Sequence, residues 1–229
     1  MPYFDLSQTQ HSWRAMYRLF TSFIQPRPIA LASTVAADGR LNLAPFSFYN
    51  MVSANPPVVV FCPSITRTGR RKDTLLNIEA TRGFVIATVT ESIAERMNIC
   101  SVEFEHGVSE FEHSGLTPVP ATKVDARLVA ESPVNIECVL RQIIRFGDQP
   151  GAGAAILGDV LAIHVTNEVF LSDKLVCDAA RLQTVGRMGG SLYSRTRDVF
   201  ALESIRDPEE FRRRGPARIQ EGAQDLTGD

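Results

Sequence analysis

The sequence predicts a mainly β fold, a closed antiparallel barrel decorated by short helices. Six or more short apolar runs, separated by turn residues and scattered short helical patterns, favour this class. Two longer runs, Val134 to Ile144 and Ala155 to Val165, alternate over much of their length, as half-buried strands do. The 229 residues fit one large β domain or two small ones, and barrels of this size often remain a single domain.

A short helix is predicted near the start of the chain. Between Ser7 and Phe23, apolar residues recur at a spacing that fits one helix face: Trp13, Met16, Tyr17 and Phe20. Pro26 and Pro28 then stop the helix and favour an extended chain.

Three strands and a hairpin turn are predicted next. The first strand runs from Ile29 to Val35, and Asp38-Gly39 is a turn because glycine tolerates a positive φ. The second strand runs from Asn42 to Phe48 and the third from Val58 to Cys62. We interpret the polar stretch between them, up to Pro57, as accessible backbone without a strand of its own.

The remaining elements follow from capping and periodicity. Helices are predicted at Asp73 to Glu79, Glu91 to Cys100 and Phe111 to Gly115, and a fourth short strand at Phe84 to Val89. Asp73 or Thr74 is the expected cap of the first of these helices, and Gly83 its end. Pro118 to Pro120 is an extended link, and the chain beyond Pro208 is either a short surface helix or disordered.

Composition excludes several classes of function. A net charge of −2 gives no basic field for nucleic acid or an anionic membrane. No apolar run approaches the roughly 18–20 residues that span a bilayer, and the N-terminus lacks the order of a secretory signal. The four cysteines form no C-x-x-C pair, so we expect free thiols in a reducing cytoplasm. His106 and His113 lie among glutamates without metal-ligand spacing, so no metal is expected.

Two segments carry residues suited to a phosphate and a flat ring. Cys62-Pro63-Ser64 precedes a cationic run from Arg67 to Lys72 and a helix start, and a hydroxyl, a cation and free N–H groups form a phosphate site. The alternative is a solvated loop beside an ordinary helix. Phe46 to Asn50 mixes aromatic and polar side chains that suit the face and edge of a planar ligand; the alternative is a turn beside core aromatics.

A series of motifs in order along the chain carries a resemblance. These are PRPIA-x-x-ST from Pro26, DGR-x-N-LAPFSF from Asp38, NPP-x-VVF from Asn55, KDT-x-x-NI from Lys72, FE-x-x-GLT-x-VP from Phe111, ESPVN-x-EC from Glu131, LGDV-x-x-IHV from Leu157 and R-x-GG-x-x-Y from Arg187. The chain resembles the flavin reductase-like, FMN-binding split-barrel family up to about Glu203. The resemblance implies an antiparallel split β-barrel with short helices: an N-terminal helical segment (1–24), the barrel domain (25–205) and a charged tail (206–229).

The resemblance also implies a cofactor site. Ser64, Lys72 and Thr74 are the leading phosphate ligands, and Asp73 is more fitted to capping. Arg27 reaches either a phosphate, an acidic neighbour or the surface, and Arg187 is either a cofactor contact or part of a structural turn. The full set of expected FMN-binding residues is Arg27, Ser33, Thr34, Ser47, Phe48, Tyr49, Asn50, Cys62, Ser64, Lys72, Asp73, Thr74 and Arg187.

The expected activity is hydride transfer from NAD(P)H to FMN, with electrons passed to an acceptor or a partner monooxygenase. No side chain is assigned as nucleophile or general base, because the cofactors carry the chemistry. His164 is read as a barrel-wall residue. No Rossmann G-x-G-x-x-G signature is present, so a nicotinamide nucleotide would bind transiently. The alternative is an FMN-binding electron carrier without nicotinamide-dependent activity. A homodimer is also expected from the resemblance.

Overall fold

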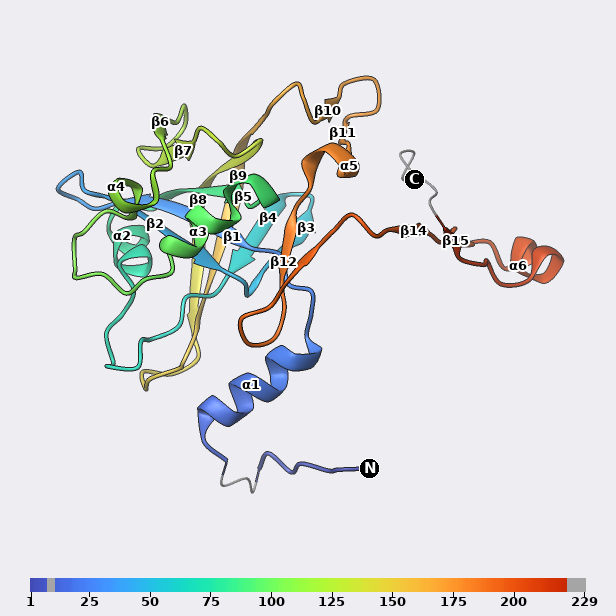
Figure 1. Ribbon diagram of the computed structural model, residues 1–229, viewed down its shortest axis with the longest axis horizontal. Helices are drawn as coiled ribbons and strands as arrows, with labels where there is room; N and C mark the ends of the chain where they lie inside the picture. The colour runs from blue at the N-terminus through green and yellow to red at the C-terminus, as the bar shows by residue number, and fades with distance from the viewer. Residues whose placement is uncertain (8–10, 222–229) are drawn as a thin grey trace.

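A seven-stranded antiparallel sheet forms the body of the protein (Figure 1). The computed structural model describes residues 1–7 and 11–221. The sheet order is β2-β1-β5-β8-β9-β4-β3. The strands are β1 (Ala30–Val35), β2 (Leu41–Phe46), β3 (Tyr49–Ala54), β4 (Pro57–Phe61), β5 (Gly83–Thr88), β8 (Val134–Arg145) and β9 (Ala154–Val165). The prediction of a mainly β fold is confirmed, as are six of these strands.

The strand β3 was not expected from the sequence. The polar stretch that was interpreted as a loop pairs antiparallel with β4, with Asn50 opposite Val60. Most of β3 is exposed, so it lacks the apolar alternation that identifies a half-buried strand. An edge strand of this kind is specified by its hairpin with β4 and not by burial.

The sheet does not close into a continuous barrel. The strands β2 and β3 are its two edges, and no strand ladder joins them in the residues that the structure describes. At the β2 edge, Leu43 N–H donates instead to Glu110 Oε2 at 2.8 Å, and Pro45 has no N–H to offer a further strand. The prediction of a closed barrel was therefore wrong, because a side chain from a neighbouring helix occupies the edge.

Two apolar clusters lie on the two faces of the sheet. One includes Phe61 and Phe84 with Leu75 and Ile78 of helix α2 (Asp73–Thr81). The other packs β1 and β2 residues against η1 (Glu91–Ile93), α3 (Ala94–Ile99) and α4 (Glu110–Ser114). Every residue of β1 is buried, including the small polar residues Ser33 and Thr34.

The ends of α2 differ from the predictions. The N-cap is Lys72, and it makes no side-chain cap hydrogen bond. Asp73 pairs with His106 Nδ1 at 2.8 Å and accepts from the Gly107 N–H, so it fastens a loop to the helix and does not cap it. Arg82, at φ 65°, ends the helix. Gly83 begins β5, where a Cβ would lie 2.9 Å from Val124 Cβ, so packing requires glycine there.

Smaller elements surround the sheet. They are the paired strands β6 (Pro118–Pro120) and β7 (Arg127–Val129), β10 (Phe170–Leu171) and β11 (Val176–Cys177), β12 (Val185–Arg187) and β13 (Tyr193–Arg195), β14 (Phe200–Ala201) and β15 (Gln220–Glu221), with helices α5 (Ala179–Leu182) and α6 (Pro208–Arg214). The segment predicted as a glycine-opened loop near Arg187 is the β12–β13 hairpin. Helix α6 is the short surface helix of the tail; residues 222–229 lie outside the described part.

Helix α1 (Trp13–Phe23) lies below the sheet in Figure 1, and its Tyr17 ring contacts Phe48 of the β2–β3 link with centroids 6.1 Å apart. Ser12 caps it, accepting from the Ala15 N–H at 3.3 Å. It therefore begins later than predicted, and residues 8–10 lie outside the described part. Only Thr21 of this helix is buried. None of the described helices is long and apolar enough to cross a bilayer.

Candidate functional site

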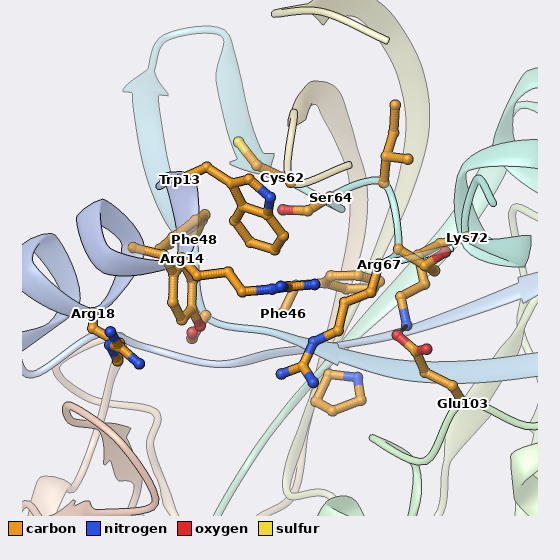
Figure 2. Close-up of a pocket in the computed structure, with 16 residues that line it drawn as sticks. Trp13, Arg14, Arg18, Phe46, Phe48, Cys62, Ser64, Arg67, Lys72 and Glu103 are labelled. Carbon is orange, nitrogen blue, oxygen red and sulfur yellow. Dashed lines mark hydrogen bonds and ion pairs between the residues drawn. The ribbon is translucent and has the colours of Figure 1, made fainter. Parts of the chain in front are cut away.

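A pocket of about 480 Å³ lies between α1, the link from β2 to β3, and the segment from β4 to α2 (Figure 2). Four aromatic side chains line it: Trp13, Tyr17, Phe46 and Phe48. Phe46 is nearly buried and packs on Phe61 with ring centroids 5.2 Å apart, so this part of the wall is fixed by the core. Pockets for small ligands span roughly 300–1,000 Å³ with few, well-placed polar groups. The volume and lining suit one planar organic ligand.

The polar side of the pocket is the β4–α2 segment, residues 62–72. Two hydrogen bonds hold the beginning of its backbone: Cys62 N–H donates to Phe48 O at 2.9 Å, and Ile65 N–H donates to Ala152 O at 2.8 Å. A tight turn follows, in which Arg70 N–H donates to Thr66 Oγ1 at 2.9 Å. The sequence folds this way because Gly69 supplies the required positive φ of 82°. The turn presents Arg67 toward the pocket.

The charges that line the pocket are unbalanced. Four cations line it, Arg14, Arg18, Arg67 and Lys72, against the single carboxylate of Glu103. Lys72 Nζ lies 3.3 Å from Glu103 Oε1. Within the described residues, the guanidinium groups of the three arginines have no hydrogen bond or ion pair. The excess of positive charge favours an anionic ligand.

Elsewhere on the surface, arginines commonly face carboxylates. Arg141 Nε pairs with Asp159 at 2.7 Å, and Arg195 and Arg197 both pair with Glu91. Arg14 and Arg67 differ from these in extending into a hollow, whereas Arg18 lies at its edge. Figure 2 shows Arg14 and Arg67 extending into the pocket from opposite sides.

Arg27 joins three segments around the pocket through its hydrogen bonds. Its side chain is buried and donates to the carbonyls of Ile24 at 2.7 Å and Met188 at 3.0 Å. Its Nε reaches Ser47 Oγ at 3.4 Å, so one guanidinium joins α1, the β12–β13 hairpin and the pocket rim. Burial lowers the pKa of Arg27 from its ordinary value. Arg27 therefore positions Ser47, and does not itself line the pocket.

A buried polar cluster anchors the start of α2. Asn42 Nδ2 donates to Thr34 Oγ1 at 3.2 Å and to Thr74 Oγ1 at 2.9 Å. Asn77 Nδ2 donates to Thr34 Oγ1 at 3.1 Å. All four side chains are buried, so they join β1, β2 and α2 and hold the helix that begins beside the pocket.

The comparisons with known proteins decide the family. A family model described as the flavin reductase like domain matches residues 23–185. The chain belongs to this family.

Solved structures of relatives agree with the family assignment. Nitrilotriacetate monooxygenase component B from Bacillus cereus is 30% identical with a TM-score of 0.81, over 88% of this chain and 98% of that one. The 2-nitrobenzoate 2-nitroreductase NbaA from Pseudomonas fluorescens is 32% identical with a TM-score of 0.79, over 90% and 97%. A protein with a split barrel domain from Shewanella frigidimarina NCIMB 400 is 23% identical with a TM-score of 0.75, over 90% and 100%. The split-barrel fold implied by the resemblance is confirmed. In this protein the split barrel is the open seven-stranded sheet.

The pocket of this flavin reductase-like protein gathers five of the predicted site residues. These are Ser47, Phe48, Cys62, Ser64 and Lys72. They come from the β2–β3 link and the β4–α2 segment, the two segments singled out in the sequence. Burial raises the pKa of the Cys62 thiol, so it is not activated as a nucleophile.

The other predicted site residues lie outside the pocket lining. Ser33 points to the opposite face of β1 from Thr34 and accepts from the Arg127 N–H. Tyr49 packs against the core, and its burial raises its pKa to about 12. Asn50 is exposed on β3 and accepts from its neighbour's N–H, and Arg187 lies over the Tyr193 ring at 4.5 Å. Thr34, Thr74, Asp73 and Arg27 have the structural contacts given above.

The sequence reasoning missed the contribution of α1. Trp13, Arg14, Tyr17 and Arg18 all line the pocket, as does Glu103 from the loop after α3. The i, i+4 pairs Trp13/Tyr17 and Arg14/Arg18 were a signal, because such pairs share one helix face. The sequence showed that these residues share a face, but not that the helix folds back over the β2–β3 link.

Proposed function

We propose that this protein binds FMN in the pocket and uses it as an NAD(P)H-dependent oxidoreductase. The observation that carries the proposal is the combination of aromatic walls with an excess of cations, among them Arg67 and Lys72 of the β4–α2 segment. A flavin mononucleotide has a planar ring and an anionic tail, which these two features match. The flavin reductase like domain supports the same ligand class.

The residues present fit the cofactor. The hydroxyl of Ser64 and the cations of Lys72 and Arg67 lie together at one side of the pocket and would take the phosphate. The start of α2 adds a favourable helix dipole beside Lys72. Phe46 and Phe48 would cover the ring, and Ser47 would meet a polar edge, held in place by Arg27.

A bound flavin supplies the hydride-accepting and electron-donating chemistry. The protein's own residues then have three tasks: to bind the phosphate, to orient the ring against the β2–β3 link and to exclude water from its face. None of these tasks requires a side chain that gains or loses a proton. This agrees with a pocket whose thiol has a raised pKa.

The relatives suggest two kinds of electron acceptor. One is a component of a nitrilotriacetate monooxygenase, and another is a 2-nitrobenzoate nitroreductase. We propose a partner monooxygenase component as the acceptor here; a small nitroaromatic compound is the other candidate. The four free thiols fit the reducing cytoplasm.

We further propose that the protein is a homodimer. A second hollow of about 350 Å³ lies between α1 and the sheet, and beyond the residues it shares with the first pocket its lining includes the exposed apolar side chains of Phe20 and Ile24. Met51 and Val52 on the edge strand β3 are further exposed apolar side chains. A surface of this kind is typical of an interface, and a second copy would cover it. Light scattering measures the expected dimer mass directly.

Anaerobic spectroscopy tests the proposed activity. The FMN-loaded protein should lose its visible flavin absorbance when NADPH or NADH is added. Bleaching by dithionite but by neither nucleotide would refute the oxidoreductase and support the electron carrier. Failure to bind FMN at all would refute both.

A further inference from the structure

The arginines of α1 lie across the pocket from the segment that we assign to the flavin phosphate. Arg14 and Arg18 are one turn apart on one helix, whereas Ser64 and Lys72 come from the β4–α2 segment (Figure 2). Both arginines are exposed, and neither guanidinium has a hydrogen bond or ion pair to the part of the chain that the structure describes.

The charge of the FMN phosphate can be matched without Arg14 and Arg18. A phosphate monoester carries about −1.5 to −2 at neutral pH. Lys72 and Arg67 on the β4–α2 segment together carry two positive charges beside the Ser64 hydroxyl, which matches that charge. Arg14 and Arg18 then remain as two uncompensated positive charges beside the aromatic rings of Trp13 and Tyr17.

We propose that Arg14 and Arg18 bind the diphosphate group of the nicotinamide dinucleotide, and so make α1 the docking element for the electron donor. This inference rests on the proposed function. Residues at i and i+4 have Cβ atoms about 5–6 Å apart, which lets two guanidinium groups engage adjacent phosphates. Guanidinium forks bind phosphate oxygens in pairs, which gives orientation as well as affinity.

The surroundings of the pair suit a dinucleotide better than a simple anion. Trp13 and Tyr17 present half-exposed rings on the same wall, and Arg14 lies over the Trp13 ring at 5.2 Å. A base or a nicotinamide ring can stack there while the diphosphate meets the arginines. The chain has no G-x-G-x-x-G motif, so no helix N-terminus of the Rossmann kind competes for this role.

Calorimetry on the FMN-loaded protein tests the assignment. The probes are NADP⁺ and NAD⁺, titrated into the wild-type protein and the double variant Arg14→Gln/Arg18→Gln. We expect the dissociation constant of each dinucleotide to rise at least about tenfold in the variant, from the loss of charged hydrogen bonds. The Kd of FMN, measured separately on the apoproteins, should change less than about twofold. Glutamine is as good a helix former as arginine, so far-UV circular dichroism should be unchanged.

Arg213→Gln is a control for the loss of a positive charge elsewhere on the surface. Arg213 is an exposed arginine of α6 that makes no side-chain hydrogen bond or ion pair within the described residues and lies away from the pocket lining, so its replacement changes the net charge alone. Its dinucleotide affinity should equal that of the wild type.

The outcomes separate the two proposals. A double variant that binds dinucleotides as tightly as the wild type overturns the α1 assignment and leaves FMN binding intact. A variant that loses FMN affinity instead would place the flavin phosphate at α1, which also overturns it. A wild-type protein that does not bind FMN refutes the proposed function itself, and the docking role falls with it.

Discussion

Two regions of this protein place charged groups in opposite environments, one with a full set of hydrogen bonds and the other with none to the part of the chain that the structure describes. Glu137 on β8 is fully buried, and it accepts hydrogen bonds from the Thr122 hydroxyl at 2.6 Å and the Lys123 N–H at 2.5 Å, and pairs with His164 Nε2 at 2.6 Å. The N–H groups of Thr122 and Val124 complete its shell. Arg14 and Arg67 in the pocket, by contrast, have no such partner among the described residues.

The difference separates structure from function. A buried charge with every lone pair satisfied stabilises one arrangement of the chain, and here it fixes the segment 122–124 against β8 and β9. Charges that face a hollow without a partner gain nothing for the fold. Their position is explained by a ligand that arrives with the opposite charge.

The largest expected effect is on the structural side of this comparison. Glu137→Gln removes the charge and turns an NH₂ group toward backbone N–H donors. We expect the free energy of unfolding to fall by about 3–5 kcal/mol, as when one partner of a buried charged network is lost. Urea unfolding measures it. Glu112→Gln, at an exposed position of α4, is the control and should cost less than about 0.5 kcal/mol. Equal stability of the two variants would contradict a structural role for Glu137.

The pH dependence follows from the same carboxylate. Burial alone would raise the pKa of Glu137, but hydrogen bonds from Thr122, His164 and the backbone outweigh it and lower the pKa to about 2. Because the folded pKa lies below the unfolded value, the stabilisation is complete above about pH 5. It is lost as the pH falls toward 2, and amounts to about 3 kcal/mol.

The difference in the free energy of unfolding between the wild-type protein and Glu137→Gln separates this contribution from that of the other carboxylates. Urea midpoints at pH 7 and near pH 3 should show the difference shrinking at the lower pH. A difference that stays constant would show that the Glu137 pKa is not depressed in the folded protein.

A smaller effect is expected from the polar cluster beneath the pocket. Thr34→Val keeps the shape of the side chain but leaves Asn42 and Asn77 without their shared acceptor. We expect a loss of about 1–2 kcal/mol in the free energy of unfolding. At temperatures where the variant is folded, its FMN affinity should stay within about threefold of the wild type, because Thr34 does not line the pocket. A large loss of affinity with unchanged stability would make Thr34 a direct ligand.

Much of the fold could be predicted because most of its strands have a recognisable pattern of apolar residues. Local sequence patterns identified five of them: mostly apolar runs at β1, β4 and β5, and alternation at β8 and β9. The strand β3 and the open edge of β2 could not be predicted this way. The first is an exposed strand with no apolar period, and the second depends on Glu110, which is 67 residues away from Leu43.

The candidate site was predictable in part for the same reason. Ser64 and Lys72 belong to one local segment whose residue types already indicate an anion. Thr34 and Thr74 are polar as expected of ligands, yet they satisfy each other through Asn42, a pairing between separate elements. The α1 residues required knowing where a loosely packed helix returns in space, which no local pattern specifies.

The proposed function depends on a cationic, aromatic pocket that holds a flavin by its phosphate. The most direct test compares the binding of FMN and of riboflavin, which lacks the phosphate, by flavin fluorescence titration. We expect FMN to bind about 10–100-fold more tightly than riboflavin, from charged hydrogen bonds to the phosphate. Lys72→Ala should remove much of that advantage, while Lys174→Ala, at an exposed lysine on the turn between β10 and β11, should preserve it. Equal affinities for the two flavins, or no binding of either, would contradict the account.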